Sequence, residues 1–357
     1  MMKSFFTIFV LLSLTTYSNI SCANTKYRVT SITGGTVSAI NDSGVVVGNA
    51  RNRAFYWSMN TGINFIGDLA GGTGTSAAYG INNRGQIVGY STTATGNRAF
   101  LWSSSTGMVN LGDLPGGIES SSANDINDAG YVVGTGFTEN GRRSFIWNSD
   151  TGMTDLGDVP GGNNDVVATA VNDLNQVTGS LFSNGIITPF LWDSATGMRN
   201  LGDLPTGAEV GFGMDINNSS QVVGRGNTSS GDRAFLWSEA NGMQNLGTLG
   251  FGSYAYGIND RGTVVGHSTI AGAHNAMIWD AANGMVNLNS KLLAEYSGWT
   301  LLEAYDINEN GWIVGLGVDP NGLQRSFLLQ PVPLPAAVWL FLSGLLGVLG
   351  VMRRRRV

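Results

Sequence analysis

The sequence is built on one phrase that occurs seven times. The pair Ile-Asn, or Val-Asn in the fourth copy, recurs at intervals of 41 to 49 residues, at Ile40, Ile81, Ile126, Val171, Ile216, Ile258 and Ile307. A tryptophan follows in the first six copies, at Trp57, Trp102, Trp147, Trp192, Trp237 and Trp279. A fixed period of about 20–50 residues indicates a repeat architecture, in which each repeat is one supersecondary unit that packs on its neighbours.

Each of the first six copies contains four short apolar segments, which lie at 77–82, 86–91, 98–102 and 108–111 in the second copy. Turns rich in Gly, Asn, Asp and Ser separate these segments, a pattern that predicts β-strands. No segment between the two ends of the chain has the apolar period of a helix. Four strands in about 45 residues are typical of one blade of a β-propeller.

The ends of the repeat array predict a closed ring. The fourth strand is missing from the seventh copy, and a lone strand at 27–32 precedes the first copy. We therefore expect an all-β, seven-bladed β-propeller in which the N-terminal strand completes the last blade and removes an open sheet edge. An open array of β-hairpins or a β-solenoid is the alternative, but neither explains the lone first strand.

The N-terminus reads as a signal peptide of residues 1–23. Lys3 precedes an apolar run at 5–14, which is too short to span a membrane. The sequence Ser21-Cys22-Ala23 then provides a site for cleavage after Ala23. Lipidation of Cys22 is the alternative, although Asn19 stands where a lipoprotein signal has an aliphatic residue. The propeller domain is expected to occupy residues 24–330.

Residues 331–357 have the composition of a second targeting segment. A proline motif that includes Val332, Pro333, Leu334 and Pro335 is followed by the uncharged run 336–352. Four arginines then follow, at Arg353, Arg354, Arg355 and Arg356. An uncharged run of this length can just cross the hydrocarbon core, and the arginines place the tail in the cytoplasm and the repeats outside.

Two resemblances follow from these motifs. The tail PVPLPAAVWLFLSGLLGVLGVMRRRR resembles the VPLPA variant of the PEP-CTERM sorting signal. That resemblance implies recognition by an exosortase-type enzyme of a Gram-negative envelope, removal of the tail, and release or attachment at the cell surface. The repeats, with RAFLW, GMVNLGDLPGG and INNRGQIVG, resemble the HAF family of extracellular repeats. Thr188, Asn275 and Leu329 depart from this pattern at positions that usually hold Arg or Trp.

Charge argues against nucleic acid and anionic lipid as partners. Without Lys3 and the four tail arginines, 14 of the 19 basic residues and all 25 acidic residues remain, so the net charge is about −11. Only two lysines, Lys26 and Lys291, belong to the predicted domain. A nucleic-acid surface needs a basic patch, and none is present.

The repeated residues are expected to be structural, because one active site does not need seven copies of a group. The tryptophans are expected to pack between blades, with exposed sugar-stacking platforms as the alternative. The turns NDSG, NNRG and their equivalents predict tight hairpins, since Asn and Asp tolerate left-handed backbone. They contain too few carboxylates for calcium. Asp125, Asp215 and Asp306 are expected near the axis, where they bind water or a cation.

No catalytic constellation, metal site or cofactor site is expected from the sequence. The two histidines, His267 and His274, belong to no zinc-binding motif. A pair of glycosidase carboxylates stays open as an alternative, because sequence does not reveal the separation of acids. Its candidates are the non-repeated acids Glu119, Asp165, Glu209 and Glu303.

Three Arg–Asp pairs are expected to form ion pairs between the third and fourth strands of a blade. In each pair the two residues lie 15 positions apart: Arg53 and Asp68, Arg98 and Asp113, Arg143 and Asp158. In an antiparallel hairpin this spacing places both side chains at the same end of the blade. The alternative is that these arginines bind an acidic glycan.

These observations favour an exported surface or matrix protein that binds polysaccharide or protein and is not an enzyme. The alternative is a propeller enzyme, a glycoside hydrolase or lyase, that acts on extracellular glycans. Its signature would be a cluster of non-repeated acids and aromatics at one mouth of the ring. Any ligand is expected at the mouth that carries the more variable loops.

Overall fold

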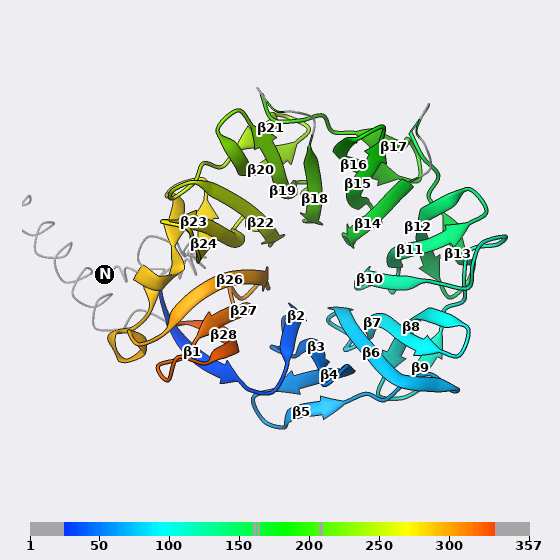
Figure 1. The fold of residues 1–357 in the computed structure, drawn as a ribbon, viewed down its shortest axis with the longest axis horizontal. Helices are drawn as coiled ribbons and strands as arrows, with labels where there is room; N and C mark the ends of the chain where they lie inside the picture. The colour runs from blue at the N-terminus through cyan, green and yellow to red at the C-terminus, as the bar shows by residue number, and fades with distance from the viewer. Residues whose placement is uncertain (1–24, 160–161, 163–164, 206, 208–209, 333–357) are drawn as a thin grey trace, which may run out of the picture.

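The computed structural model describes residues 25–332 except 160–161, 163–164, 206 and 208–209. Seven four-stranded antiparallel sheets surround a central axis in a closed ring (Figure 1). The all-β, seven-bladed β-propeller predicted from the repeats is thus confirmed. In this part of the chain, no helix is long and apolar enough to cross a membrane. The predicted signal peptide, Glu209 and residues 333–357 of the predicted sorting tail lie outside the described residues.

In every blade we call the strand at the axis the first strand and the outermost strand the fourth (Figure 1). Blades 1 to 3 contain β2 (Thr36–Ile40), β3 (Val46–Ala50), β4 (Arg53–Ser58) and β5 (Gly62–Phe65); β6 (Gly72–Ile81), β7 (Ile87–Thr93), β8 (Gly96–Ser103) and β9 (Gly107–Asn110); and β10 (Ser122–Ile126), β11 (Val132–Thr138), β12 (Gly141–Asn148) and β13 (Gly152–Asp155). Blades 4 and 5 contain β14 (Asp165–Val171), β15 (Val177–Ser183), β16 (Ile186–Asp193) and β17 (Gly197–Asn200); and β18 (Gly211–Ile216), β19 (Val222–Thr228), β20 (Gly231–Ser238) and β21 (Gly242–Asn245). Blade 6 contains β22 (Gly252–Ile258), β23 (Val264–Ile270), β24 (Ala273–Asp280) and β25 (Gly284–Asn287), and two 3-10 turns, η1 (Leu288–Lys291) and η2 (Ala294–Tyr296), follow it.

Blade 7 is assembled from both ends of the propeller, as the missing fourth strand predicted. It contains β26 (Thr300–Ile307), β27 (Ile313–Val318), β28 (Gln324–Val332) and, as its outer strand, β1 (Lys26–Ile32). All seven residues of β1 pair with β28, from Lys26 opposite Val332 to Ile32 opposite Ser326. This pairing closes the ring and leaves β28 without a free edge.

The last strand extends two residues beyond the boundary expected at Gln330. Pro331 and Val332 pair with β1, so Val332, which the sequence placed in the sorting motif, is also the last residue of a propeller strand. Proline is tolerated at this point because pairing between β27 and β28 begins only at Ile313 and Leu329. Pro331 therefore lies where no second strand requires its missing N–H.

The antiparallel order of the strands gives the ring two different mouths. The short turns between first and second strands, and between third and fourth strands, lie at one mouth, which we call the turn mouth. The connections between second and third strands, and from each fourth strand to the next blade, lie at the other, which we call the loop mouth.

The hydrophobic core is divided into seven clusters, each shared by adjacent blades. A fully buried phenylalanine on the third strand is central to most of them, at Phe55, Phe100, Phe145, Phe190, Phe235 and Phe327, and Met277 replaces it in blade 6. The tryptophans lie in these clusters: Trp57 packs with Val314 and Leu328 of the neighbouring blade. The expectation that they pack between blades is confirmed.

Every innermost strand carries a β-bulge just before its last two residues, which the sequence did not reveal. In blade 2 the register shifts between Ala78 and Gly80, leaving Tyr79 as the extra residue. The partner on the second strand is Gly89, where a Cβ would lie 1.9 Å from the carbonyl oxygen of Ala77. Only glycine permits this approach, which explains the repeated Val-Gly or Thr-Gly of the second strands.

A ring of buried asparagines joins all seven blades at the turn mouth. In each blade the Asn side chain donates from Nδ2 to the backbone carbonyl of the equivalent Asn in the next blade, at 2.9–3.2 Å. The members are Asn41, Asn82, Asn127, Asn172, Asn217, Asn259 and Asn308, and each is at most 5% exposed. The last bond, from Asn308 to Asn41, joins blade 7 to blade 1 and completes the ring.

A second ring follows one residue later. The backbone N–H of each residue after the Asn donates to a side-chain oxygen of its equivalent in the next blade, at 2.6–2.9 Å. Its members are Asp42, Asn83, Asp128, Asp173, Asn218, Asp260 and Glu309. The repeated Asn-Asp and Asn-Asn pairs are therefore contacts between blades as well as turn formers.

Replacing Asn82 with Asp should destabilise the ring. Asp keeps the oxygen that accepts from the N–H of Gln86, but it cannot donate to the carbonyl of Asn127. We expect the free energy of unfolding to fall by about 2 kcal/mol, because a buried acceptor loses its donor and meets a carboxylate. Urea unfolding of Asn82→Asp measures this loss.

Asn110→Asp is the matched control for that substitution. Asn110 is exposed, and its Oδ1 accepts from the N–H of Gly112, a contact that Asp155 makes with Gly157 in blade 3. We expect a change within about 0.5 kcal/mol. Equal stability of the two variants would show that the asparagine ring contributes nothing beyond its turns.

Three aspartates make further contacts between blades near the axis. Asp125 accepts from the N–H of Val171, Asp215 from that of Ile258, and Asp306 from that of Ile40, at 2.8–2.9 Å. These bonds give the carboxylates a structural role, whereas the sequence suggested water or a cation. Burial raises the pKa of Asp125 and Asp306 to about 6, and it raises the pKa of Asp215 as well.

These carboxyls should make stability depend on pH. Their folded pKa is raised above the unfolded value of 3.8, so their stabilising contribution is complete below pH 4 and is lost as pH rises through about 6. His267 acts in the opposite sense over the same range, since its pKa is lowered to about 4. The test therefore compares the variant Asp306→Ala with the unmodified protein. Between pH 5 and 8, the free energy of unfolding should decrease less in the variant.

Asp319→Ala is the control for this pH dependence. Hydrogen bonds from the N–H of Leu323 and other groups lower the pKa of Asp319, so its contribution changes only at more acidic pH. We expect its stability curve to run parallel to that of the unmodified protein from pH 5 to 8. A parallel curve for Asp306→Ala would contradict the assignment.

Candidate functional site

The loop mouth loses its sevenfold regularity in blades 4 to 7. At one position on the second strand, blades 1 to 4 have Asn49, Tyr90, Thr135 and Ser180, whereas blades 5 and 6 have Arg225 and His267. The residues that face these two on the innermost strands are Phe212 and Tyr254. Blades 5 and 6 therefore pair a basic side chain, Arg or His, with an aromatic ring across these two strands, a combination that blades 1 to 4 lack.

These side chains form a continuous series, which we call the aromatic arc. It consists of Phe182, Phe212, Arg225, Tyr254, Tyr256, His267, His274 and Tyr305. Phe182 and Phe212 meet edge to face at 6.1 Å, and the Arg225 guanidinium lies 4.1 Å from the Phe212 ring and 4.9 Å from the Tyr254 ring. Stacking of Arg on two aromatic rings is favourable and fixes its orientation.

Asp232 anchors the middle of the arc. Its Oδ2 accepts from Arg225 Nη1 at 3.0 Å and from the Tyr254 hydroxyl at 2.6 Å. Burial and the hydrogen bond to Asp232 raise the pKa of Tyr254, so this phenol stays a neutral donor. The contacts hold Arg225 between a carboxylate and two rings, and they leave the arc rigid.

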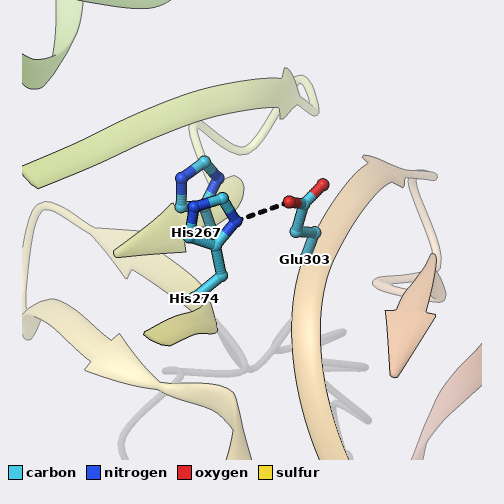
Figure 2. Close-up of side chains that lie close together, drawn as sticks. All are labelled: His267, His274 and Glu303. Atoms are coloured by element: carbon cyan, nitrogen blue, oxygen red, sulfur yellow. Dashed lines mark hydrogen bonds and ion pairs between the residues drawn. The ribbon is translucent and has the colours of Figure 1, made fainter. Parts of the chain in front are cut away.

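His267 and His274 continue the arc in blade 6. Their rings stack at 4.0 Å, and His267 also stacks on Tyr254 at 4.7 Å, so it lies between two rings. His274 Nδ1 lies 2.6 Å from Oε1 of Glu303, which comes from the innermost strand of blade 7 (Figure 2). Burial lowers the pKa of His267 to about 4, so its imidazole is neutral at neutral pH.

Tyr256 and Tyr305 end the arc on the side of the axis. They are the bulge residues of blades 6 and 7, and their rings lie 6.0 Å apart. Burial, followed by the charge of Glu303, raises the pKa of both phenols. Both therefore present a ring and a neutral hydroxyl, a combination suited to ligands with both apolar and hydroxylated faces.

The other non-repeated acids named from the sequence lie apart from the histidines. Glu119 makes an ion pair with Arg98 at 2.5 Å. Asp165 lies at the blade 4 end of the arc, opposite Phe182, and makes an ion pair at 2.7 Å with Arg142, whose guanidinium lies 4.9 Å from the Phe182 ring. Glu209 lies outside the described residues. Of the four candidates, Glu303 alone is shown beside other ionisable groups of the arc.

The Arg98–Asp113 ion pair is present. Arg98 Nε lies 3.1 Å from Asp113 Oδ2, and the arginine side chain is only 8% exposed. Its other nitrogens donate to the carbonyls of Asn97 and Glu119, to Thr95 Oγ1 and to Glu119 Oε2. The hydrogen bond from Thr95 and the charge of Arg98 lower the pKa of Glu119. Arg98 therefore holds the connection between blades 2 and 3, which makes a structural role the simplest account.

The other two expected pairs need correction. Arg53 is exposed, and in the part of the chain that the structure describes it makes no ion pair with Asp68. In blade 1, Arg53 pairs with Ala50 directly beside the turn between β3 and β4. In blade 2, by contrast, β8 begins two residues before Arg98. Arg53 thus lies at the tip of a hairpin and not within it.

Arg143 is the second correction. Its Nε lies 3.8 Å from Asp155, while Asp158 accepts from the N–H of Val159 at 2.7 Å. The carboxylate of Asp158 therefore bonds its own connecting loop.

Arg98→Ala should be much more destabilising than Arg53→Ala. Removal of Arg98 leaves Asp113 without its counter-ion and the carbonyl of Glu119 without a donor, so we expect a loss of about 3 kcal/mol. Arg53 is exposed, and its removal should change stability by less than about 0.5 kcal/mol. Urea unfolding of both variants tests this, and equal effects would contradict the structural role of Arg98.

The turn mouth also has a cavity, with a volume of about 350 Å³. Members of the two rings line it, including the five acids of the second ring. Their oxygens accept from backbone N–H groups and from Asn83 and Asn218. We therefore interpret this cavity as the inner surface of the ring closure.

The first of three comparisons with solved structures supports this architecture. Virginiamycin B lyase from Staphylococcus aureus matches with a TM-score of 0.57 at 12% identity, over 86% of this chain and 100% of that chain. The Dos1 propeller matches with a TM-score of 0.49 at 12% identity, over 85% and 95% of the two chains. A putative TolB from Agrobacterium tumefaciens gives 0.47 at 10% identity, over 87% and 99%. These likenesses concern the fold alone. Comparison with protein-family models and with curated proteins finds no match.

The sequence predicts any ligand at the loop mouth but does not reveal the arc. Its members come from four blades and from several positions of the repeat, so no single motif connects them. One signal was available: the position of Arg225 and His267 on the second strand is the one where the copies differ most in chemistry.

Proposed function

We propose that this protein is an exported propeller of the cell surface or extracellular matrix that binds polysaccharide along the aromatic arc without cleaving it. The observation that carries the proposal is the arc itself. It is a continuous run of rings and hydroxyls across blades 4 to 7, on a scaffold that is otherwise repetitive.

The shape and chemistry of the arc favour a sugar polymer. Aromatic rings provide flat apolar faces, while the hydroxyls of Tyr256 and Tyr305 and the carboxylate of Glu303 provide hydrogen-bonding groups beside them. A run that continues from Phe182 to Tyr305 can contact several units of a linear chain. The net charge of about −11 favours a neutral polysaccharide over a polyanion, since long-range repulsion opposes the latter.

The proposed address rests on the two ends of the chain. The signal-peptide pattern of residues 1–23 supports export, and the resemblance of residues 331–357 to an exosortase sorting signal supports processing of the tail. Before processing, the C-terminal segment would hold the protein in the membrane. These assignments are independent of the arc.

Tyr305→Ala should weaken polysaccharide binding. We expect at least a tenfold loss of affinity, because tyrosine side chains that contact a ligand commonly contribute more than about 1.4 kcal/mol. A glycan array identifies ligands of the full chain, and affinity electrophoresis in gels containing the best neutral polysaccharide measures each variant.

Tyr79→Ala is the matched control. Tyr79 occupies the same bulge position in blade 2, is 38% exposed and lies outside the arc. Its removal should leave affinity within twofold. Equal losses in both variants, or binding to a protein partner and to no glycan, would overturn the proposal.

The second candidate function is a glycoside hydrolase or lyase. The contact between His274 and Glu303 favours it, because a histidine beside a carboxylate is a common general base. Release of reducing sugar or of unsaturated ends from an array-positive polysaccharide, abolished by Glu303→Gln, would establish this activity in place of simple binding.

A further inference from the structure

The chain has two histidines in 357 residues, and the fold stacks them on each other. In the register of β23 and β24, His267 faces Ala276 and His274 faces Thr269. The two histidines are thus diagonal neighbours on one face of the sheet. Glu303 approaches the same face from blade 7 (Figure 2).

These three side chains can share one ion. One potential ligand atom from each lies within 4.8 Å of the others. Ligand atoms of a tetrahedral zinc lie about 3.4 Å apart, which follows from bonds of about 2.0–2.1 Å. Closing this difference requires a tilt of the His274 ring, whose side chain is 48% exposed.

His267 supplies the second, independent indication. The residue is 2% exposed, and its Nδ1 is buried without a hydrogen-bond partner among the described residues. A buried polar nitrogen of this kind normally finds a partner, because leaving it unsatisfied costs about 1–3 kcal/mol. Stacking between Tyr254 and His274 also fixes the plane of its ring, as a preorganised ligand requires.

We propose that His267, His274 and Glu303 form a binding site for a divalent transition metal, with zinc as the best match. Two imidazoles and one carboxylate are a ligand set that zinc uses when its fourth position stays open to water or a ligand. Imidazole ligands argue against calcium and magnesium, which take oxygen. The site lies on the aromatic arc, but the proposal does not depend on polysaccharide binding.

The test uses the full chain without a histidine tag, stripped with a chelator, and Zn²⁺ alone as the probe. Isothermal titration calorimetry should show one Zn²⁺ per chain at micromolar affinity or better. Co²⁺ should bind at the same site and give the visible absorption of a four-coordinate ion. No glycan is present, so the result is separate from that of the array.

Variants then assign the ligands. His274→Ala removes an exposed ligand with little risk to the fold, and we expect at least a hundredfold loss of Zn²⁺ affinity and loss of the Co²⁺ absorption. Glu303→Gln should weaken binding at least tenfold. Glu295→Gln removes the same charge from η2, away from the histidines, and should leave affinity within twofold.

Two results would overturn the site. One is the absence of stoichiometric Zn²⁺ binding by the folded protein. The other is unchanged Zn²⁺ affinity in both His274→Ala and Glu303→Gln. If the variant His267→Gln does not fold, its Zn²⁺ affinity cannot be measured. The Zn²⁺ affinity of His274→Ala then tests the site by itself, because His274 lies at the surface.

Discussion

Hydrogen bonds between equivalent asparagines hold the seven blades in a closed ring. The side-chain oxygen of each asparagine accepts from its own turn, and its amide nitrogen donates to the next blade, so one residue type shapes the hairpin and joins the sheets. The bond from Asn308 to Asn41 can form only when blade 7 lies beside blade 1, and the pairing of β1 with β28 brings this about. Closure by the terminal strand and closure by the asparagine ring therefore support each other.

Because the asparagine ring and the terminal strand close the propeller, the sequence of the loop mouth can vary. The turn mouth is fixed by two rings of hydrogen bonds and the blade interfaces by buried Phe and Val, so neither can change without loss of stability. At the loop mouth the residues of the arc differ from the repeat, and the hydrogen bonds that close the ring at the turn mouth stay in place. Neighbouring carboxylates hold several members of the arc: Asp232 bonds Arg225 and Tyr254, and Glu303 contacts His274. Preorganisation of this kind lowers the entropic cost of binding a ligand.

The proposed zinc site lies on the surface that we propose for polysaccharide binding. A zinc ion on His267, His274 and Glu303 would lie beside Tyr256 and Tyr305, within reach of a polysaccharide that follows the rings. Such an ion would orient hydroxyl groups of a bound sugar, and its open position would be the place where a hydrolytic activity arises. The two proposals thus meet at one site, yet each stands on its own measurements.

The sequence by itself determined the number of blades, the closing strand and the positions of the core. These features repeat every 41 to 49 residues and depend on local pairing, so periodicity is enough to reveal them. The sequence did not reveal local details of register: the bulges shift one side chain per blade, and two extra residue pairs in the blade 2 hairpin bury Arg98, whereas Arg53 is exposed. The arc and the histidine cluster were decided by tertiary structure alone. His267, His274 and Glu303 are separated by 7 and 29 residues and occupy different positions of two repeats, so only the packing of blade 7 on blade 6 brings them together.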